Sequence, residues 1–549
     1  MKFKILAIFI CILFIASTLT TTVTAATLKI STIPAFPGAQ GFGTKTRGAY
    51  GGGIDPVIYK VTNLNAYGAG SLGYGLADIS EPRVIIFETS GTIELTNWIR
   101  VDNPYVIVAG QTAPSPGITL KGAGIYILTH DVIIQHIRIR VGDGSNGPTY
   151  SWRDNLDIGE SGKLPFNVVI DHCSFSWATD ENTGTWYPTH DVTYQWCIIS
   201  EALQDSYHPE GPHSMGMLIG PESYKTSIHH NLFANNANRN PLVGAYGETE
   251  IINNVVYNWM WGSTEFQHYS SAAAQYGNII GNYYKAGKNT LGKNQAIMVY
   301  YATAPSKFYI HDNIGPARTS NDQDDWAIVL SSSNRDTLRS NTPTFQSTGI
   351  TTQSAFDAYD SVLTNAGARP GDRDSVDKRI VGEVKMGSGQ IIDSQDDVGS
   401  WPTLAKNYRA LTVPSNPHSD SDADGYTNLE EWLQSYAAEI ETITSVNYTT
   451  ETENQSSGNT ATNTETQPSS NQTTNTETQP SSNPSTNTET QPSSNQTTKT
   501  KKHSSNSHSS TRRKANPDFT TKSVGFLGFM EKFYDKFGSL ADLLRFELK

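Results

Sequence analysis

Residues 168–196 read VVIDHCSFSWATDENTGTWYPTHDVTYQW and hold one short block twice, as VVIDH and as VTYQW, with corresponding positions 24 residues apart. Both blocks are rich in β-branched or aromatic residues and are followed by polar, turn-forming residues, which is typical of short strands. The cysteines that follow the two blocks, Cys173 and Cys197, have the same separation. A fixed separation between strand-like blocks predicts that they stack as successive rungs of a repeat architecture.

The repeat extends to both sides of this stretch. The matching blocks are VIIQH (132–136), VVIDH (168–172), VTYQW (192–196), TSIHH (226–230), EIINN (250–254) and AQYGN (274–278), and their last residues are 36, 24, 34, 24 and 24 apart. A basic period of 24 with loop insertions predicts an all-β fold, a right-handed parallel β-helix. We expect asparagines and histidines at the block ends to form side-chain ladders, and the two cysteines to be buried small hydrophobic residues, not a disulfide or a metal pair.

The beginning of the chain indicates secretion. Residues 1–25 combine Lys2 and Lys4, an apolar centre and a small-residue cleavage site, Val23-Thr24-Ala25, as secretory signals do. The apolar run is shorter than the roughly 20 residues that span a bilayer. We expect residues 26–415 to form the β-helix domain and 416–440 to form a calcium loop with a short helix.

Composition changes sharply near residue 441. Near-copies of TNTETQPSSNQT fill the low-complexity Thr/Ser/Asn/Gln/Pro region 441–515, which predicts a disordered spacer that ends in a basic patch. Glycosylation-type sequons in this region fit a glycoprotein with a decorated extracellular stalk. They lie at Asn447, Asn454, Asn471 and Asn495.

Residues 516–549 carry one apolar stripe at helical spacing, which predicts a short amphipathic helix. The stripe comprises Phe526, Met530, Phe533, Phe537, Leu540 and Leu544. Two interpretations remain open: a helix that docks within the protein, or attachment of 499–549 to a cell envelope or membrane surface.

The formal net charge of the chain is −13. This charge argues against nucleic acid as a partner and against passive attraction to a polyanion. An acidic substrate would need local help, from a metal ion or from clustered arginines. We expect the protein to be a monomer.

The stretch TSIHHNLFANNANRNPLVGA (226–245) places Arg239 nine residues past the ladder position at His230. Side chains beyond the strand end leave the core, so we expect Arg239 to face a groove. Pro241 stiffens the backbone two residues further on.

Several spaced motifs resemble the secreted pectate lyases of polysaccharide lyase family 1, across about residues 35–320. The motifs are AFPGAQGFG (35–43), VTNL (61–64), GSL (70–72), FETSGTI (87–93), AGQTAP (109–114), VVIDHCSFSWATDEN (168–182), HSMGMLIG (213–220) and HHNLFANNANRNP (229–241). The resemblance implies a parallel β-helix that cleaves polygalacturonate (pectate) by calcium-assisted β-elimination. It also implies that Arg239, in Arg-Asn-Pro, is the base. A guanidinium is protonated at ordinary pH, so such an enzyme should gain activity as the pH rises.

The resemblance also implies ligands for Ca²⁺. Asp154, in RDNLDI, and Asp180, in SWATDEN, match the family's ligand positions. The family often has a further aspartate four residues after the second position, where this chain has Gly184. We therefore add Glu181 and Asp157 as candidate ligands.

Two more positions depart from the family pattern. A lysine of the family corresponds to the region His213-Ser214-Met215, and a second arginine corresponds to Gly244. We expect His213 to contact the substrate carboxylate, with a turn histidine as the alternative.

Two further substrate-binding candidates come from the residues themselves. Arg138 and Arg140 alternate with isoleucines in IRIR, so both should face one side, and we predict that Arg140 lines the groove. Trp186 lies in an insertion, where it either stacks on a sugar ring or packs the loop.

The segment DSDADGYTNLEE (420–431) fits a calcium-binding loop, D-x-D-x-D-G-x5-E. We predict a structural calcium loop that closes the domain, because Pro414 and Pro417 exclude the incoming helix of an EF-hand. Its expected ligands are Asp420, Asp422, Asp424, Asn428 and Glu431.

Two other functions remain open. A polygalacturonase-type hydrolase would need a carboxylate pair, for which QDD (323–325) and QDD (395–397) are candidates. A non-catalytic surface adhesin that binds polysaccharide would need neither a base nor a metal.

Overall fold

The computed structural model describes residues 33–269, 273–291, 295–302 and 305–442. The predicted secretion signal, the spacer beyond Thr442, the basic patch and the apolar stripe of 516–549 lie outside the described residues. The described residues belong to one compact unit of the chain, which runs to Thr450. None of the helices in the described ranges has the length and apolar character needed to cross a membrane.

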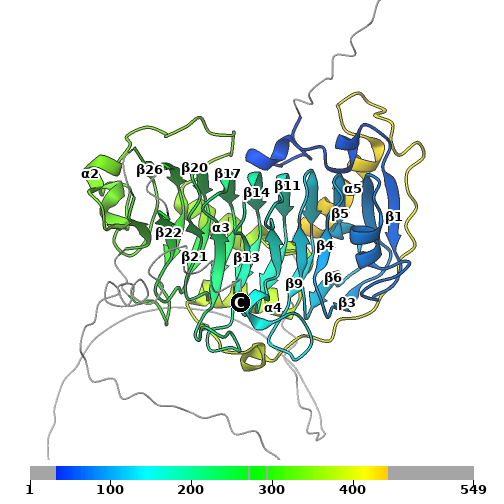
Figure 1. Cartoon of the computed structure of the whole chain (residues 1–549), viewed down its shortest axis with the longest axis horizontal. Coiled ribbons are helices and arrows are strands. Elements are labelled where there is room, and N and C mark those ends of the chain that lie inside the picture. Colours follow the sequence, from blue (N-terminus) through cyan, green and yellow to red (C-terminus); the bar gives the residue numbers. More distant parts are fainter. Residues whose placement is uncertain (1–32, 270–272, 292–294, 303–304, 443–549) are drawn as a thin grey trace, which may run out of the picture. The chain divides into compact units, whose positions relative to one another are not determined.

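Three parallel sheets build the described part of the molecule, and from β2 to β26 successive strands go to successive sheets, so that each complete rung adds a strand to each sheet. The fold is a right-handed parallel β-helix, as predicted. Figure 1 shows the rungs side by side, from β1 (blue) at one end to β26 (green) at the other. The last strand of this solenoid in the described residues ends at Ser331.

The ten-stranded sheet contains β1 (Val57–Val61), β2 (Arg83–Phe87), β5 (Val106–Ala109), β8 (Val132–Gln135), β11 (Phe166–Asp171), β14 (His190–Gln195), β17 (Tyr224–His229), β20 (Gly247–Ile252), β23 (Gln275–Ile280) and β26 (Lys307–His311). The nine-stranded sheet contains β4 (Ile99–Val101), β7 (Ile125–Ile127), β10 (Leu156–Ile158), β13 (Glu181–Thr185), β16 (Met215–Ile219), β19 (Leu242–Val243), β22 (Thr264–Gln267), β25 (Ile297–Tyr300) and β27 (Val329–Ser331). The eight-stranded sheet contains β3 (Gly91–Glu94), β6 (Ile118–Lys121), β9 (Arg138–Arg140), β12 (Ser174–Ser176), β15 (Ile198–Ser200), β18 (Leu232–Ala234), β21 (Val255–Tyr257) and β24 (Tyr283–Lys285).

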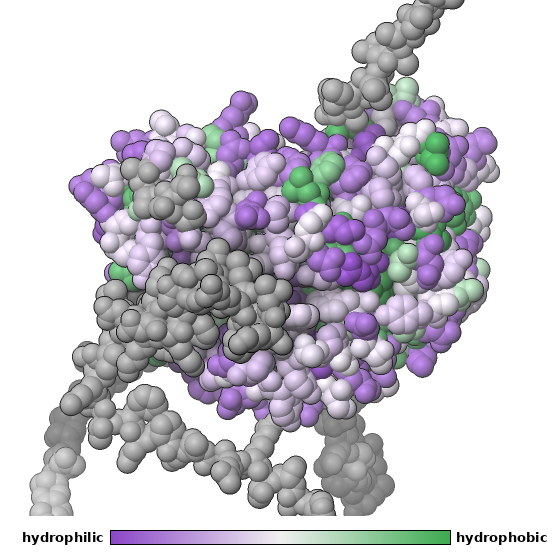
Figure 2. Space-filling model, in the orientation of Figure 1, coloured by the Kyte–Doolittle hydropathy of each residue, from purple (hydrophilic) through white to green (hydrophobic). Residues whose placement is uncertain are grey.

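The core is a set of columns in which each rung places an apolar side chain above the previous one. One column, fully or almost fully buried, runs through Ile134, Ile170, Tyr194, Ile228, Ile251, Ile279 and Ile310. Burial of apolar area inside the solenoid supplies most of its stability. The face drawn in Figure 2 is accordingly mostly hydrophilic, with hydrophobic residues in small scattered patches.

The predicted register is confirmed for the first three spacings and wrong for the last two. Asp171 pairs with Gln135 and with Gln195, and Gln195 pairs with His229. His229, however, pairs with Ile252, one residue from the predicted partner, and Ile252 pairs with Ile280, four residues away from the prediction. The loops before β20 and β23 make these two rungs shorter and longer than the basic period of 24 residues. One polar residue per block is too little information to predict such changes in rung length.

The predicted asparagine ladder is present in the corrected register. Each amide accepts from the backbone of the rung before it: Asn231 from Cys197 N, Asn254 from Asn231 N, and Asn282 from Asn254 N, at 2.8–2.9 Å. These bonds satisfy buried turn groups that would otherwise be unpaired. Cys173 and Cys197 are buried free thiols, as predicted.

The N-terminal residues cover the ten-stranded sheet. Gly43 lies so close that a Cβ would be 2.3 Å from Val168 O, which explains a glycine there. Its N–H donates to Thr193 Oγ1 (3.0 Å), and the neighbouring Phe42 N–H donates to Ser227 Oγ (3.0 Å).

After β27 the chain returns along the solenoid, and its described part, up to residue 442, carries the helices α2 (Arg335–Leu338), α3 (Ala355–Asn365), α4 (Ser375–Met386) and α5 (Asn428–Glu441). Buried residues of α3 and α4 pack on the eight-stranded sheet. Leu429 and Leu433 of α5 join a cluster with Phe36 and the ten-stranded sheet, so the last helix covers the N-terminal segment.

Candidate functional site

The predicted catalytic and metal residues meet at one edge of the nine-stranded sheet, where strands of neighbouring rungs begin. Glu181, the first residue of β13, is opposite Met215, the first residue of β16. Met215 forms a bridge with Asn238, next to Arg239. Asp154 lies two residues before β10, one rung away. Residues far apart in the sequence therefore share one place because the strands are in parallel register.

Asp154, Asp180 and Glu181 form a carboxylate cluster in which one oxygen of each lies within 4.8 Å of the others. The Glu181 N–H donates to Asp154 Oδ1 at 2.8 Å, which fixes the spacing of the two rungs. Burial, and then repulsion from Asp180 and Asp157, raises the pKa of Asp154 well above its usual value. A partly buried set of repelling carboxylate oxygens fits a hard divalent cation such as Ca²⁺, which would relieve that repulsion.

Asp157 is the next carboxylate along this row, and burial raises its pKa to about 7. It pairs in register with Gly184, the position that departs from the family pattern. A Cβ on Gly184 would lie only 2.6 Å from Leu218 O, so the strand backbones leave no room for a side chain there. Position 184 therefore offers no ligand, and Asp157 is the nearest carboxylate in that row.

Arg239 forms an ion pair with Glu181, and about a quarter of its side chain is exposed. The cation of the predicted base thus lies directly beside the carboxylate cluster. Arg239 has a left-handed backbone (φ 57°), and its N–H donates to Asn238 Oδ1 (2.9 Å) and to Glu265 Oε1 (3.2 Å). These two bonds hold a backbone conformation that a non-glycine residue rarely adopts.

Glu265, beside Arg239, was not predicted from the sequence. It lies in β22, is 2% exposed, and pairs with Leu242 in β19. Burial raises its pKa to about 7, against the opposing influence of Arg239. The sequence feature that could have pointed to Glu265 is a glutamate in a strand whose other residues are mostly buried.

His213 reaches the cluster, where its Nε2 lies 2.8 Å from Asp180 Oδ1. A second histidine that was not predicted, His208, stacks on it with ring centroids 3.9 Å apart. The Nε2 atom of His208 lies 3.8 Å from the other oxygen of Asp180. Burial acts to raise the pKa of Asp180, but hydrogen bonds from the two histidines bring it down to about 2. The string HPEGPH, with two histidines around a turn, was the signal for this pair.

Arg140 does not reach the groove. It faces the same side as Arg138, as the alternation predicted, but α4 covers both and leaves Arg140 fully buried. Its guanidinium binds Asp374 at 2.5 and 3.1 Å and Asp377 at 2.7 Å. The alternation of arginine and isoleucine correctly predicted which face of the strand the arginines occupy. It could not predict that α4, much later in the sequence, covers that face.

Trp186 lies beyond the far end of β13 and is 37% exposed. Its ring meets the ring of Tyr269 edge-on, with centroids 6.2 Å apart. Trp186 is therefore available at the surface, one strand length from Arg239.

The predicted calcium loop brings three carboxylates together. One oxygen each of Asp420, Asp422 and Asp424 lies within 4.8 Å of the others, and all three residues are exposed. The pKa of Glu431 is raised, first by desolvation and then by repulsion from these aspartates, so its carboxylate is near them. Asn428, the first residue of α5, donates its amide to Asn416 O at 2.8 Å.

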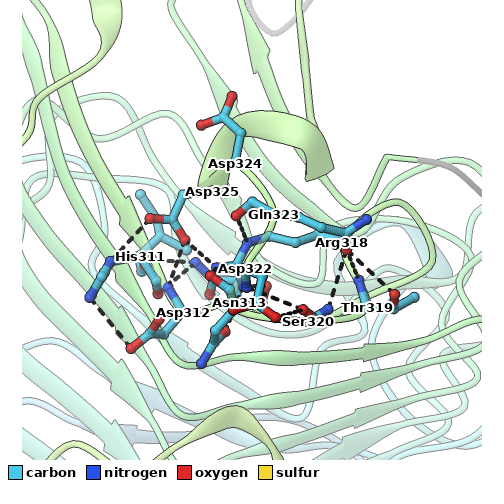
Figure 3. Close-up of polar contacts among 12 residues, drawn as sticks. His311, Asp312, Asn313, Arg318, Thr319, Ser320, Asp322, Gln323, Asp324 and Asp325 are labelled. Carbon is cyan, nitrogen blue, oxygen red and sulfur yellow. Dashed lines mark hydrogen bonds and ion pairs between the residues drawn. The ribbon is translucent and has the colours of Figure 1, made fainter.

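The carboxylates proposed for a hydrolase have structural partners. Asp325 binds Arg318 at 2.8 Å and His311 at 3.1 Å, whereas Asp324 points away from them, as Figure 3 shows, and binds Arg339 at 2.8 Å. In the second QDD stretch, Asp397 caps a short helix by accepting from Ser394 N. Neither stretch presents two free carboxylates across an open groove.

The chain was compared with curated proteins, and the relatives found share one description. A probable pectate lyase C of Aspergillus fumigatus (strain Af293) is 31% identical over 429 residues, which cover 74% of this chain and 94% of that protein. A probable pectate lyase C of Aspergillus oryzae is 32% identical with the same coverage. No family model matches the chain.

A search of solved structures gave matches of low sequence identity. The cedar pollen allergen jun a 1 has a TM-score of 0.45 at 17% identity, and the similarity covers 60% of this chain and 92% of the allergen. A pectate lyase bound to a hexasaccharide has a TM-score of 0.42 at 16% identity, with 62% and 99% covered.

Proposed function

The chain belongs to the pectate lyase family, and from this premise we propose that it cleaves polygalacturonate by β-elimination, with Arg239 as the base and Ca²⁺ as the metal. The observation that carries the proposal is the position of Arg239, whose guanidinium is paired with Glu181 of the partly buried carboxylate cluster.

The reaction defines what these side chains must do. A galacturonate unit carries a proton on carbon 5, beside its carboxylate, and a leaving sugar on carbon 4. Removal of the proton places further negative charge on an anionic group, and bound Ca²⁺ would neutralise that charge as a Lewis acid. In its neutral guanidine form Arg239 takes the proton, the bond from carbon 4 to the leaving sugar oxygen breaks, that oxygen takes a proton from solvent, and a double bond forms between carbons 4 and 5. The two backbone bonds to Asn238 and Glu265 hold the backbone from which the Arg239 side chain extends.

We assign the metal to Asp154, Asp180, Glu181 and Asp157, because oxygens of the first three lie within 4.8 Å of one another, and burial and neighbouring carboxylates raise the pKa values of Asp154 and Asp157. His208 and His213 position Asp180 and keep it ionised, as its depressed pKa indicates. The region His213-Ser214-Met215 thus corresponds to the place where the family often has a lysine. His213 is also the candidate contact for a substrate carboxylate, and Trp186 for a sugar ring.

A second Ca²⁺ would bind the loop of Asp420, Asp422, Asp424, Asn428 and Glu431. This loop begins α5, which covers the N-terminal segment, so we propose a structural role for it. The signal-like residues 1–25 support secretion of the enzyme, and residues 499–549 support attachment to a cell envelope or membrane surface.

The test is the ultraviolet absorbance of unsaturated product on polygalacturonate, with calcium and with chelator, for the native chain and two variants. Arg239→Ala should lose about 10²–10⁴-fold in kcat, as loss of a general base does. Arg339→Lys is the matched control, because that arginine also pairs with a carboxylate but lies away from the cluster, and it should keep full activity.

Other results would refute the proposal. Full activity of Arg239→Ala would place the base elsewhere. Saturated chain ends without unsaturated product would indicate a hydrolase, and polymer binding with no product at all would favour the adhesin.

A further inference from the structure

A row of aromatic rings follows the starts of the strands in the ten-stranded sheet. His130, Phe166, His190 and Tyr224 stack with ring centroids 4.6, 5.0 and 5.0 Å apart and interplanar angles of 12°, 4° and 19°. The stack follows the register, in which Phe166 pairs with His190 and His190 pairs with Tyr224. Each rung therefore contributes one ring to the row.

The row of rings stops at Gly247. This glycine begins β20, next to β17, and occupies the register position that follows Tyr224. A Cβ placed on it would be in ordinary contact with Tyr224 Cβ, at 3.5 Å. One face of the Tyr224 ring stacks on His190. At the register position facing its other face, the next described rung has Gly247, which has no ring. Tyr224 is 39% exposed, so this second face is accessible.

A hollow of about 440 Å³ lies at this position. It is lined by Glu222, Tyr224, Tyr246, Gly247, Glu248 and Tyr276, together with Ser223. The volume is within the range of small-molecule sites. The hollow is separate from the Arg239 cluster: β16 starts beside Glu181 and ends at Ile219, so one five-residue strand, about 16 Å, lies between them.

The lining indicates the chemistry of a ligand. A flat ring placed on the open face of Tyr224 would continue the row of stacked rings. A pyranose can take this place, because the C–H bonds on one face of the sugar pack against an aromatic ring. The carboxylates of Glu222 and Glu248 accept hydrogen bonds from hydroxyl groups. The lining residues include no lysine or arginine, so a uronate would meet two negative charges without a counter-charge.

We propose that this hollow is a second carbohydrate site, which binds an uncharged pyranose through stacking on Tyr224 and hydroxyl contacts to Glu222 and Glu248. The site is independent of the elimination chemistry. It would let the enzyme hold a neutral part of a polysaccharide while the Arg239 cluster holds the acidic part.

The test uses the full native chain and isothermal titration with galactotetraose, a neutral probe that has no uronate to eliminate. Tyr224→Ala should weaken binding at least tenfold, whereas Tyr224→Phe, which keeps the stacking face, should bind within about twofold of the native chain. The matched control is Tyr74→Ala. Tyr74 is 38% exposed and stacks on Tyr59 at 5.8 Å, but it lies away from the hollow, so binding should not change.

The competing outcomes are distinct. Failure of galactotetraose to bind, or equal binding by Tyr224→Ala, would overturn the proposal. Trigalacturonate or tetramethylammonium that binds in a Tyr224-dependent way would show an acid-binding or a cation-binding site instead. Activity of Tyr224→Ala on polygalacturonate should be unchanged. A large loss would make the hollow part of the catalytic groove, whereas failure of the lyase assay itself would leave the galactotetraose result intact.

Discussion

Gly244 lies directly beneath the ring of Tyr269: a Cβ on the glycine would be 2.6 Å from Tyr269 Cε2 and 3.3 Å from Ile219 O. This is the position where the resemblance to the family leads one to expect a second arginine. The ring occupies the space that such a side chain would need, so the loss of the arginine and the presence of the tyrosine are two parts of one arrangement.

Gly244→Ala should therefore destabilise the protein by about 1–3 kcal/mol, the usual cost of overpacking. Urea unfolding measures this. The double variant Gly244→Ala/Tyr269→Ala should recover part of the loss. Gly382→Ala is the control, because that glycine lies within α4 with only Met386 Cε near its Cβ position, at 3.9 Å, and alanine there should stabilise the helix. Equal stability of Gly244→Ala and the native chain would show that the ring moves freely.

Arg140→Met should reduce stability by about 3–5 kcal/mol, because it leaves Asp374 and Asp377 buried without their main partner. Thermal unfolding and kcat/KM of the folded fraction should be measured together, and kcat/KM should not change. Arg100→Met removes a half-exposed pair with Glu160 and should cost less than about 1 kcal/mol. A raised KM with unchanged stability would instead restore Arg140 to the substrate groove.

Glu265→Gln should raise stability at alkaline pH. The pKa of Glu265 is raised from 4.5 to about 7, so the unfolded chain ionises it first and folding loses stability as the pH rises between these values. Above about pH 7 the full cost is about 3 kcal/mol, and below about pH 4.5 it vanishes. Urea unfolding of both proteins at pH 4 and pH 9, with chelator present, should show a gain for the variant only at pH 9. A gain of equal size at both values would contradict a titration of this carboxyl.

Asp422→Asn should have opposite effects with and without calcium. With chelator it relieves repulsion among the carboxylates of the loop and should raise the melting temperature. With calcium it removes a ligand and should lower the melting temperature relative to the native chain. Asp396→Asn, an exposed aspartate of a short helix, should show neither effect. Identical melting curves of the native chain in calcium and in chelator would argue against a metal in this loop.

The solenoid could be predicted because the sequence repeats with the rungs: Cys173, Cys197 and the asparagines of the ladder recur at one position of successive rungs. The register of β20 and β23 could not, because Asn254 and Asn282 are 28 residues apart and the loop between them has no periodic signal. Only the backbone pairing settles which asparagine lies on which.

The site was predictable as far as it consists of linear motifs. Asp154, Asp180 and Arg239, which the resemblance to the family pointed to, lie together with Glu181. Residues that act from another rung or from the returning segment were beyond reach, because their proximity depends on packing. Glu265 lies a full rung past Arg239, and the partner of Arg140 lies more than two hundred residues away.

The segment of the last described helix contacts the N-terminal part of the described chain: Tyr426, two residues before α5, donates its hydroxyl to Pro34 O at 3.1 Å, and Glu430 of α5 is paired with Arg47 at 2.6 Å. At its other end, Glu441 lies 3.3 Å from His136. A mechanical pull on the chain beyond Thr442 would thus load α5 in shear across several rungs at once, instead of peeling away a terminal rung. An anchored form of this protein would resist drag through the combined strength of the contacts that α5 makes along the solenoid.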